Sequence, residues 1–214
     1  MTTSAVLVDY GVGNLLSAKR ALEACNAQVE VTGDPARVAK ADRVVLPGVG
    51  AFGDCVKELD SRGLTTAVQE FARTQRPLLG ICVGMQVLME YGEEFGRHPG
   101  LGLIAGGVLR IPEIDTAGQP LKLPHIGWTE LKLPSSRNSW NGTIFAGLDA
   151  DPSVYFVHSF AARPSNPSDI LAQVDYGGHQ VVAAVSCDAV SGTQFHPEKS
   201  GPVGLAILSK FLAL

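Results

Sequence analysis

Along the first half of the chain, short apolar runs alternate with segments whose apolar residues recur every three to four positions. We predict strands at four of the short runs, which cover residues 5–9, 28–31, 43–46 and 77–81. The segments between and after them predict helices: one after its N-cap Asn14, a short one that opens at Asp34-Pro35, one over 54–74 that breaks near Gly63, and one over 85–91. Repeated strand–helix units of this kind indicate a mostly parallel sheet with helices on both faces.

The second half of the chain has a different pattern. After about residue 101, short runs rich in β-branched residues are separated by Gly, Pro, Asn and Asp, and they cover residues 108–111, 154–157, 170–174 and 181–185. Such runs predict hairpins that extend the sheet with antiparallel strands. The apolar segment 203–214 predicts a C-terminal helix. Because no linker-like stretch interrupts the pattern, residues 1–214 are expected to form a single α/β domain.

Composition narrows the choice of partners and compartment. The net charge of −4 and the lack of a basic run argue against nucleic acid as a partner. No apolar stretch approaches the roughly 20 residues that cross a bilayer, and the N-terminus has no signal-peptide pattern. We therefore expect a cytoplasmic protein that does not bind membranes.

The cysteines and histidines show neither disulfide nor metal spacing. The four cysteines include no CxxC pair and stand at positions Cys25, Cys55, Cys82 and Cys187. Four histidines have no spacing typical of a metal site and are expected to be structural or interface residues: His98, His125, His158 and His179. The sequence thus predicts no metal and no cofactor, and a free thiol that can act as a nucleophile.

The segment Gly80-Ile81-Cys82-Val83-Gly84 has the layout of a nucleophile elbow, because it joins a predicted strand to a predicted helix. A sharp turn of this kind strains the backbone at the nucleophile and leaves little room for side chains on either side. The helix that follows directs its N-terminal N–H groups toward the thiol, which favours the thiolate and supplies an oxyanion donor. A buried structural cysteine fits the pentapeptide about equally well.

A nucleophilic thiol needs a base, and that base needs an orienting partner. The segment Phe195-His196-Pro197-Glu198 offers both, because residues i and i+2 of an extended segment point the same way. The zinc deaminases also use His-x-Glu, but their Pro-Cys-x-x-Cys partner is absent from this sequence. On its own the segment fits an exposed loop; together with the elbow it favours catalysis.

These two segments resemble the class I (triad) glutamine amidotransferases. Within that family the chain is most similar to the glutaminase subunits of imidazole glycerol phosphate synthases, and the resemblance extends over nearly the whole sequence. It rests on the order and spacing of fragments at residues 9–14, 46–52, 79–86, 124–128, 155–160 and 194–200. The family has a flavodoxin-like fold, so the resemblance implies the same α/β class as the pattern.

The resemblance implies a role for each matching residue. Cys82 is the nucleophile, His196 the general base and then acid, and Glu198 orients His196. The oxyanion hole is formed by the N–H groups of Val49, in a strand whose peptide can flip, and of Val83. The bound glutamine is held by a set of five residues: Gly50, Gln86, Glu94, Ser159 and Phe160.

The resemblance also implies a partner, a separate (β/α)₈ barrel synthase that consumes the ammonia in a heterodimer. It places the loop 9–14 and Lys199 against that partner. The loop has a Gly-x-Gly after a strand, but the third Gly of a dinucleotide site is absent. Two alternatives remain at this point: another thiol hydrolase on the same scaffold, including an amidotransferase serving a different synthase, and a non-catalytic binding module.

Overall fold

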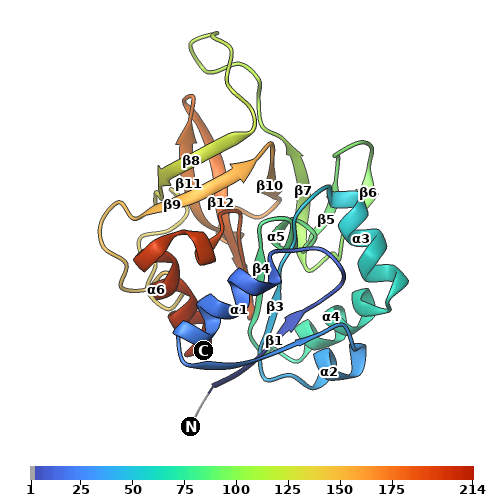
Figure 1. Cartoon of the computed structure of the whole chain (residues 1–214). Helices are drawn as coiled ribbons and strands as arrows, with labels where there is room; N and C mark the ends of the chain where they lie inside the picture. The colour runs from blue at the N-terminus through green and yellow to red at the C-terminus, as the bar shows by residue number, and fades with distance from the viewer. Residues whose placement is uncertain (1–2) are drawn as a thin grey trace.

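A central sheet of seven strands dominates the computed structural model, which describes residues 3–214 (Figure 1). The strands are β1 (Thr3–Val8), β2 (Ala27–Thr32), β3 (Val44–Leu46), β4 (Leu78–Ile81), β11 (Ile170–Tyr176), β12 (His179–Cys187) and β13 (Val190–Thr193). Their order is β11-β12-β13-β4-β3-β1-β2. The ladder from β2 to β13 is parallel, and β12 and β11 extend it antiparallel. This confirms the predicted α/β class.

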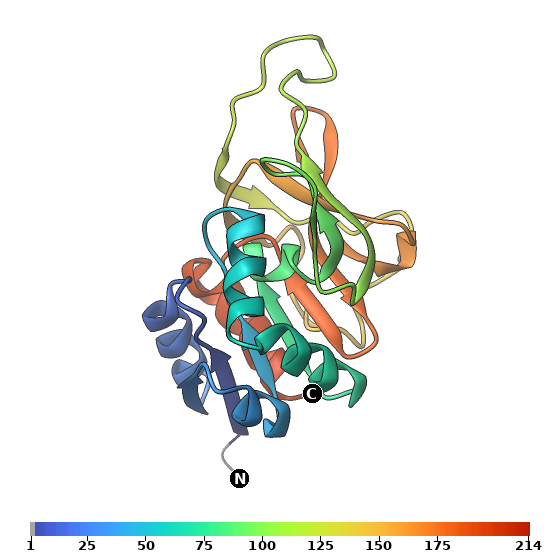
Figure 2. The ribbon, with the colours of Figure 1, turned by 90° about the vertical axis from the view of Figure 1, so that its right-hand side faces the viewer.

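Helices cover both faces of this sheet. They are α1 (Leu15–Ala24), α2 (Pro35–Lys40), α3 (Phe52–Ser61), α4 (Leu64–Arg73), α5 (Val83–Gln86) and α6 (Gly201–Leu212). Helices α1 and α6 contact each other on one side, and α2, α3 and α4 lie together on the other, the side that faces the viewer in Figure 2. Among residues 3–214, no helix is both long and apolar enough to cross a membrane.

The predicted N-cap residues form the expected side-chain hydrogen bonds at the starts of α1 and α2. The Asn14 side chain accepts a hydrogen bond from the Ser17 N–H, and Asp34 caps α2 in the same way through the Ala36 N–H. Gly63 adopts a left-handed conformation with φ of 68° and separates α3 from α4. The strand predictions at 5–9, 28–31, 43–46 and 77–81 correspond to β1 to β4.

The predicted helix over 85–91 is wrong beyond its first turn. Helix α5 ends at Gln86, and residues Met89–Gly92 form the strand β5. Val87, Leu88 and Met89 are all fully buried, so this segment has no polar face of the kind that a surface helix presents. The Leu88 carbonyl accepts instead from the N–H groups of the chain entering β7, at residues 103 and 104.

Two smaller sheets lie beside the central one. The first has the order β10-β7-β5-β6, with β10 (Phe160–Pro164), β7 (Ile104–Arg110), β5 (Met89–Gly92) and β6 (His98–Pro99). The second pairs β8 (His125–Glu130) with β9 (Ser153–His158). The sequence predicts that the runs at 108–111 and 154–157 extend the central sheet. This prediction is wrong, because the two runs correspond to the end of β7 and to β9, which belong to the smaller sheets. The alternation of apolar and polar residues identifies a strand. Which strand it pairs with depends on contacts with residues far away in the sequence.

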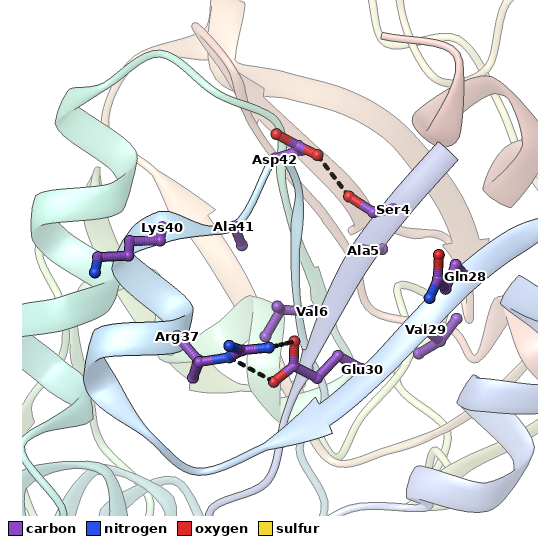
Figure 3. A pocket seen from close by; sticks show the side chains of 10 residues that line it. All are labelled: Ser4, Ala5, Val6, Gln28, Val29, Glu30, Arg37, Lys40, Ala41 and Asp42. Atoms are coloured by element: carbon purple, nitrogen blue, oxygen red, sulfur yellow. Dashed lines mark hydrogen bonds and ion pairs between the residues drawn. The ribbon is translucent and has the colours of Figure 1, made fainter. Parts of the chain in front are cut away.

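A depression of about 400 Å³ lies at the amino ends of β1 and β2, beside α2 (Figure 3). The Arg37 guanidinium donates to both carboxylate oxygens of Glu30, at 2.8 and 2.7 Å, and the Ser4 hydroxyl donates to Asp42. The first contact ties α2 to β2, and the second ties the segment after α2 to β1. Cys82 follows the carboxyl end of the parallel strand β4. The depression lies at the amino ends of the parallel strands, so it is at the opposite end of the strands from this thiol.

Candidate active site

Cys82 lies in the turn between β4 and α5, with φ of 56° and ψ of −116°. This is a strained conformation for a residue with a side chain. The turn is closely packed on both sides: a Cβ on Gly80 would lie 2.6 Å from the Gly84 carbonyl oxygen, and a Cβ on Gly84 would lie 1.9 Å from the Leu46 carbonyl oxygen. The structure thus has the elbow geometry that the sequence predicts, and the two glycines are required by close backbone approach.

His196 and Glu198 form a hydrogen-bonded pair beside this thiol. The distance from His196 Nδ1 to Glu198 Oε1 is 2.8 Å, and both side chains are buried. The expected extended segment is wrong, since residues Pro197–Lys199 form a 3₁₀ turn, η2. The contact survives because His196 itself is extended (φ −94°, ψ 98°) and the turn carries the carboxylate back toward the imidazole.

The electrostatic environment favours a protonated His196. Burial by itself lowers the pKa of this imidazole, but hydrogen bonds to Cys82 and Glu198, together with their charges, outweigh burial and raise the pKa to about 9. His196 is therefore expected to be protonated near neutral pH, so it can supply a proton to a leaving group, and the thiol beside it is the candidate nucleophile.

One cavity of about 230 Å³ brings the predicted site residues together. Cys82 and His196 line it along with Val49, Val83 and all five residues expected to hold glutamine, namely Gly50, Gln86, Glu94, Ser159 and Phe160. Glu198 is not in this lining; it contacts the side of His196 that bears Nδ1. Two further residues line the cavity: Val157, which sequence reasoning did not single out, and His158, which it expected to be a structural or interface residue.

The segment Pro47–Gly50 approaches the cavity and is held from behind by two buried side chains. The Tyr10 hydroxyl donates to the Pro47 carbonyl at 2.6 Å, and the Cys55 thiol donates to the Val49 carbonyl at 3.3 Å. Gly50 has φ of 88°, a conformation that favours glycine. Burial raises the pKa of Cys55 to about 11, so this thiol remains a donor at neutral pH.

The two N–H groups predicted for an oxyanion hole occupy different settings. Val83 is the first residue of α5, where helical N–H groups have no partner within the helix. The Val49 N–H lies between the two anchored carbonyls, those of Pro47 and of Val49 itself, and Val49 is 39% exposed. Glu94 is fixed at the start of α3, because its Oε2 accepts from the Phe52 N–H at 2.8 Å.

Gln194 is the site residue that sequence reasoning missed most clearly. It is fully buried beside Cys82, and its Nε2 lies 3.8 Å from the Cys82 Sγ. Its place two residues before His196, in a segment that resembles the family, was the available signal. The sequence around it does not indicate the contact with Cys82.

A comparison with known families decides the identity. The sequence profile described as "Glutamine amidotransferase class-I" matches residues 6–214. The chain belongs to the class I glutamine amidotransferases. The predicted enzyme class, a hydrolase acting on glutamine, is thereby confirmed.

This amidotransferase has close relatives in several bacteria. It is 47% identical over 212 residues to "Imidazole glycerol phosphate synthase subunit HisH 1" of Legionella pneumophila (strain Lens), an alignment that covers 99% of this chain and 100% of the relative. It is 46% identical over 207 residues to the HisH subunit of Syntrophotalea carbinolica, with 96% of this chain and 98% of the relative covered. The resemblance drawn from the sequence fragments is therefore confirmed.

Solved structures show the same fold at low identity. "Structure of PurLQS from Thermotoga maritima" superposes with a TM-score of 0.74 at 19% identity, and covers 100% of this amidotransferase and 99% of that chain. "Crystal structure of glutamine amidotransferase" gives a TM-score of 0.71 at 17% identity, with 98% and 99% covered.

Proposed function

We propose that this chain is the glutaminase subunit of an imidazole glycerol phosphate synthase and acts in histidine biosynthesis in the cytoplasm. The observation that carries the catalytic part is the elbow thiol of Cys82 in one cavity with His196, which Glu198 orients. The names of the full-length relatives support the synthase assignment. Glutamine is the substrate, and the products are glutamate and ammonia.

The first half of the reaction forms a thioester. The Cys82 thiolate attacks the side-chain amide carbon of glutamine, and a C–S bond forms as the carbonyl electrons move to oxygen. The protonated His196 then gives its proton to the leaving nitrogen, the C–N bond breaks, and ammonia departs. The raised pKa of His196, about 9, keeps that proton available at neutral pH.

The second half releases glutamate. Neutral His196 takes a proton from water, the hydroxide oxygen attacks the thioester carbon, and the C–S bond breaks to restore the thiolate and imidazolium. Negative charge develops on the substrate oxygen in both halves. The N–H groups of Val83 and Val49 are proposed to stabilise it, each contributing about 10²–10³ in turnover.

The substrate's own ammonium and carboxylate are proposed to contact Gly50, Gln86, Glu94, Ser159 and Phe160, which line the same cavity. Glu94 adds a carboxylate for the ammonium. The acceptor chemistry is assigned to a separate (β/α)₈ barrel subunit that receives the ammonia in a heterodimer.

Glutamate release by the purified chain tests this proposal. We expect the chain alone to release glutamate slowly, and the rate to rise strongly when a (β/α)₈ barrel synthase and its ligand are added. In Cys82→Ala we expect no glutamate release under either condition. Cys187→Ala is the matched control, because this partly exposed cysteine lies outside the cavity lining. Full activity without a partner would refute the partner-dependent part and favour a free-standing hydrolase. No activity under either condition would refute the enzymatic proposal for Cys82.

A further inference from the structure

The carbonyl oxygen of Phe160 receives hydrogen bonds from two side chains near the cavity. Gln86 Nε2 lies 3.1 Å from it and His158 Nδ1 lies 2.8 Å from it. A carbonyl oxygen can only accept, so both facing nitrogens must be donors. This main-chain atom therefore fixes the orientation of the Gln86 amide and the tautomer of His158.

The same logic determines the orientation of Gln194. Gln86 Nε2 also lies 2.9 Å from Gln194 Oε1, and because that nitrogen is a donor, the facing atom of Gln194 must be its oxygen. The amide nitrogen of Gln194 is then directed to the other side, where the Cys82 Sγ lies 3.8 Å away. Both amides are buried, so an unsatisfied orientation would be costly.

We infer that Gln194 is a positioning residue of the amidotransferase site: its Nε2 donates to the Cys82 thiolate, and its Oε1 holds the Gln86 amide so that Gln86 Oε1 is left for the ligand. This inference rests on the proposed role of Cys82 as nucleophile. It extends that role by adding a second donor to the thiolate, besides the imidazole of His196.

Gln194 is well placed for a fixed contact. Its own N–H donates to the Ala183 carbonyl at 2.8 Å, which ties its backbone to β12. Its side chain is fully buried between two groups that it can satisfy at once. Hydrogen bonds to a charged acceptor are about twice as strong as those between neutral groups, so the contact gains strength when the thiol ionises.

Other ionisable groups also face Cys82 and must be held constant in a test. His196 lies on one side with Glu198 behind it. Cys55 and Tyr10, behind the segment 47–50, are near enough that the charge of Cys82 raises the pKa of each. Glu94 and His158 line the same cavity. A neutral substitution at position 194 leaves all of these groups in place.

The pH dependence of Cys82 alkylation by iodoacetamide tests the inference without glutamine. Mass spectrometry of the Cys82 peptide separates its rate from those of the other three cysteines, with Cys82→Ala as the blank. In Gln194→Met, a variant of similar length without the amide, the midpoint of the rate–pH profile is expected to rise by about one unit, a tenfold loss of reactive thiolate at lower pH. The KM for glutamine is also expected to rise, because Gln86 is no longer held.

Gln69→Met is the matched control. The Gln69 amide donates to the Leu101 carbonyl at 2.8 Å and lies outside the cavity lining, so its midpoint and KM should equal those of the wild type. A midpoint in Gln194→Met that also equals the wild type would overturn the inference, even if the chain is a glutaminase. A shifted midpoint in a chain that never releases glutamate would support the contact and refute the proposed function alone.

A second measurement covers the case in which Gln194→Met does not fold. The side-chain amide resonances of Gln194 can be followed by NMR in the wild type and in Cys82→Ala. Loss of the sulfur acceptor should shift one amide proton of Gln194 upfield and leave those of Gln69 unchanged. An unchanged Gln194 amide would contradict the proposed contact.

Discussion

The buried pair His125 and His158 provides the most quantitative prediction. Burial lowers the pKa of His125 to about 4, and burial together with the nearby imidazoles lowers the pKa of His158 to about 3, against the ordinary value of 6.5. His158 donates to the Phe160 carbonyl, so its Nε2 accepts from His125 Nδ1 at 3.2 Å, and His125 Nε2 accepts from the Thr129 hydroxyl at 2.8 Å. Both rings are thus held neutral.

The sign of the pH effect follows from these lowered values. The folded state resists protonation, whereas the unfolded chain takes up a proton at each histidine below about pH 6.5, so this contribution to stability is present above 6.5 and is lost as pH falls. Each group costs about 1.4 kcal/mol per pH unit in that range. At pH 5.5 these two histidines together therefore reduce the free energy of unfolding by about 3 kcal/mol, a loss that the raised pKa of His196 offsets in part because it acts in the opposite direction.

Urea unfolding at pH 7.5 and at pH 5.5 measures this effect. His125→Gln should remove about half of the histidine contribution, so the loss of stability between the two pH values should be about 1.4 kcal/mol smaller than in the wild type. His179→Gln is the control, since His179 is partly exposed at the start of β12. Equal losses in the wild type and in His125→Gln would refute the reasoning that burial keeps this pair neutral.

Two further predictions concern the catalytic turn and the triad. In Glu198→Gln the pKa of His196 should fall, because Glu198 helps to raise it, and glutamine turnover should drop at least about 100-fold while the circular dichroism spectrum is retained; an unchanged pH–rate profile would remove Glu198 from the triad. Gly84→Ala should lower the free energy of unfolding by at least about 3 kcal/mol, because its Cβ would lie 1.9 Å from the Leu46 oxygen. Gly50→Ala, with open space but φ of 88°, should cost about 1–2 kcal/mol; equal costs in urea unfolding would contradict the packing argument.

Local patterns predicted the parts of the fold that depend on neighbours in sequence. The strand–helix alternation gave β1 to β4 and α1 to α4, because caps and periodicity act within a few residues. The helix prediction over 85–91 was wrong because Val87, Leu88 and Met89 are all buried. Without a polar face, periodicity cannot distinguish a helix from a strand. The pairing of β8 with β9 depends on tertiary contacts and had no local signal.

The candidate site divides in the same way. Cys82 with its flanking glycines, and the pair His196 and Glu198, are short-range patterns that the sequence displays. Gln194 contacts Gln86 and Cys82, which precede it by 108 and 112 positions in the sequence. Nothing in the sequence around Gln194 indicates those partners. The support of segment 47–50 by Tyr10 and Cys55 likewise joins separate parts of the chain. Such contacts become visible once the fold is known.

The Phe160 carbonyl has a consequence for how this site can vary in evolution. A main-chain oxygen is present whatever side chain is encoded, so no substitution can turn it into a donor. The direction of the hydrogen bonds through Gln86 and Gln194 is therefore set by an atom that mutation cannot alter. Replacements that survive at these positions should keep a donor directed at that oxygen, and changes at the two glutamines should occur together rather than singly.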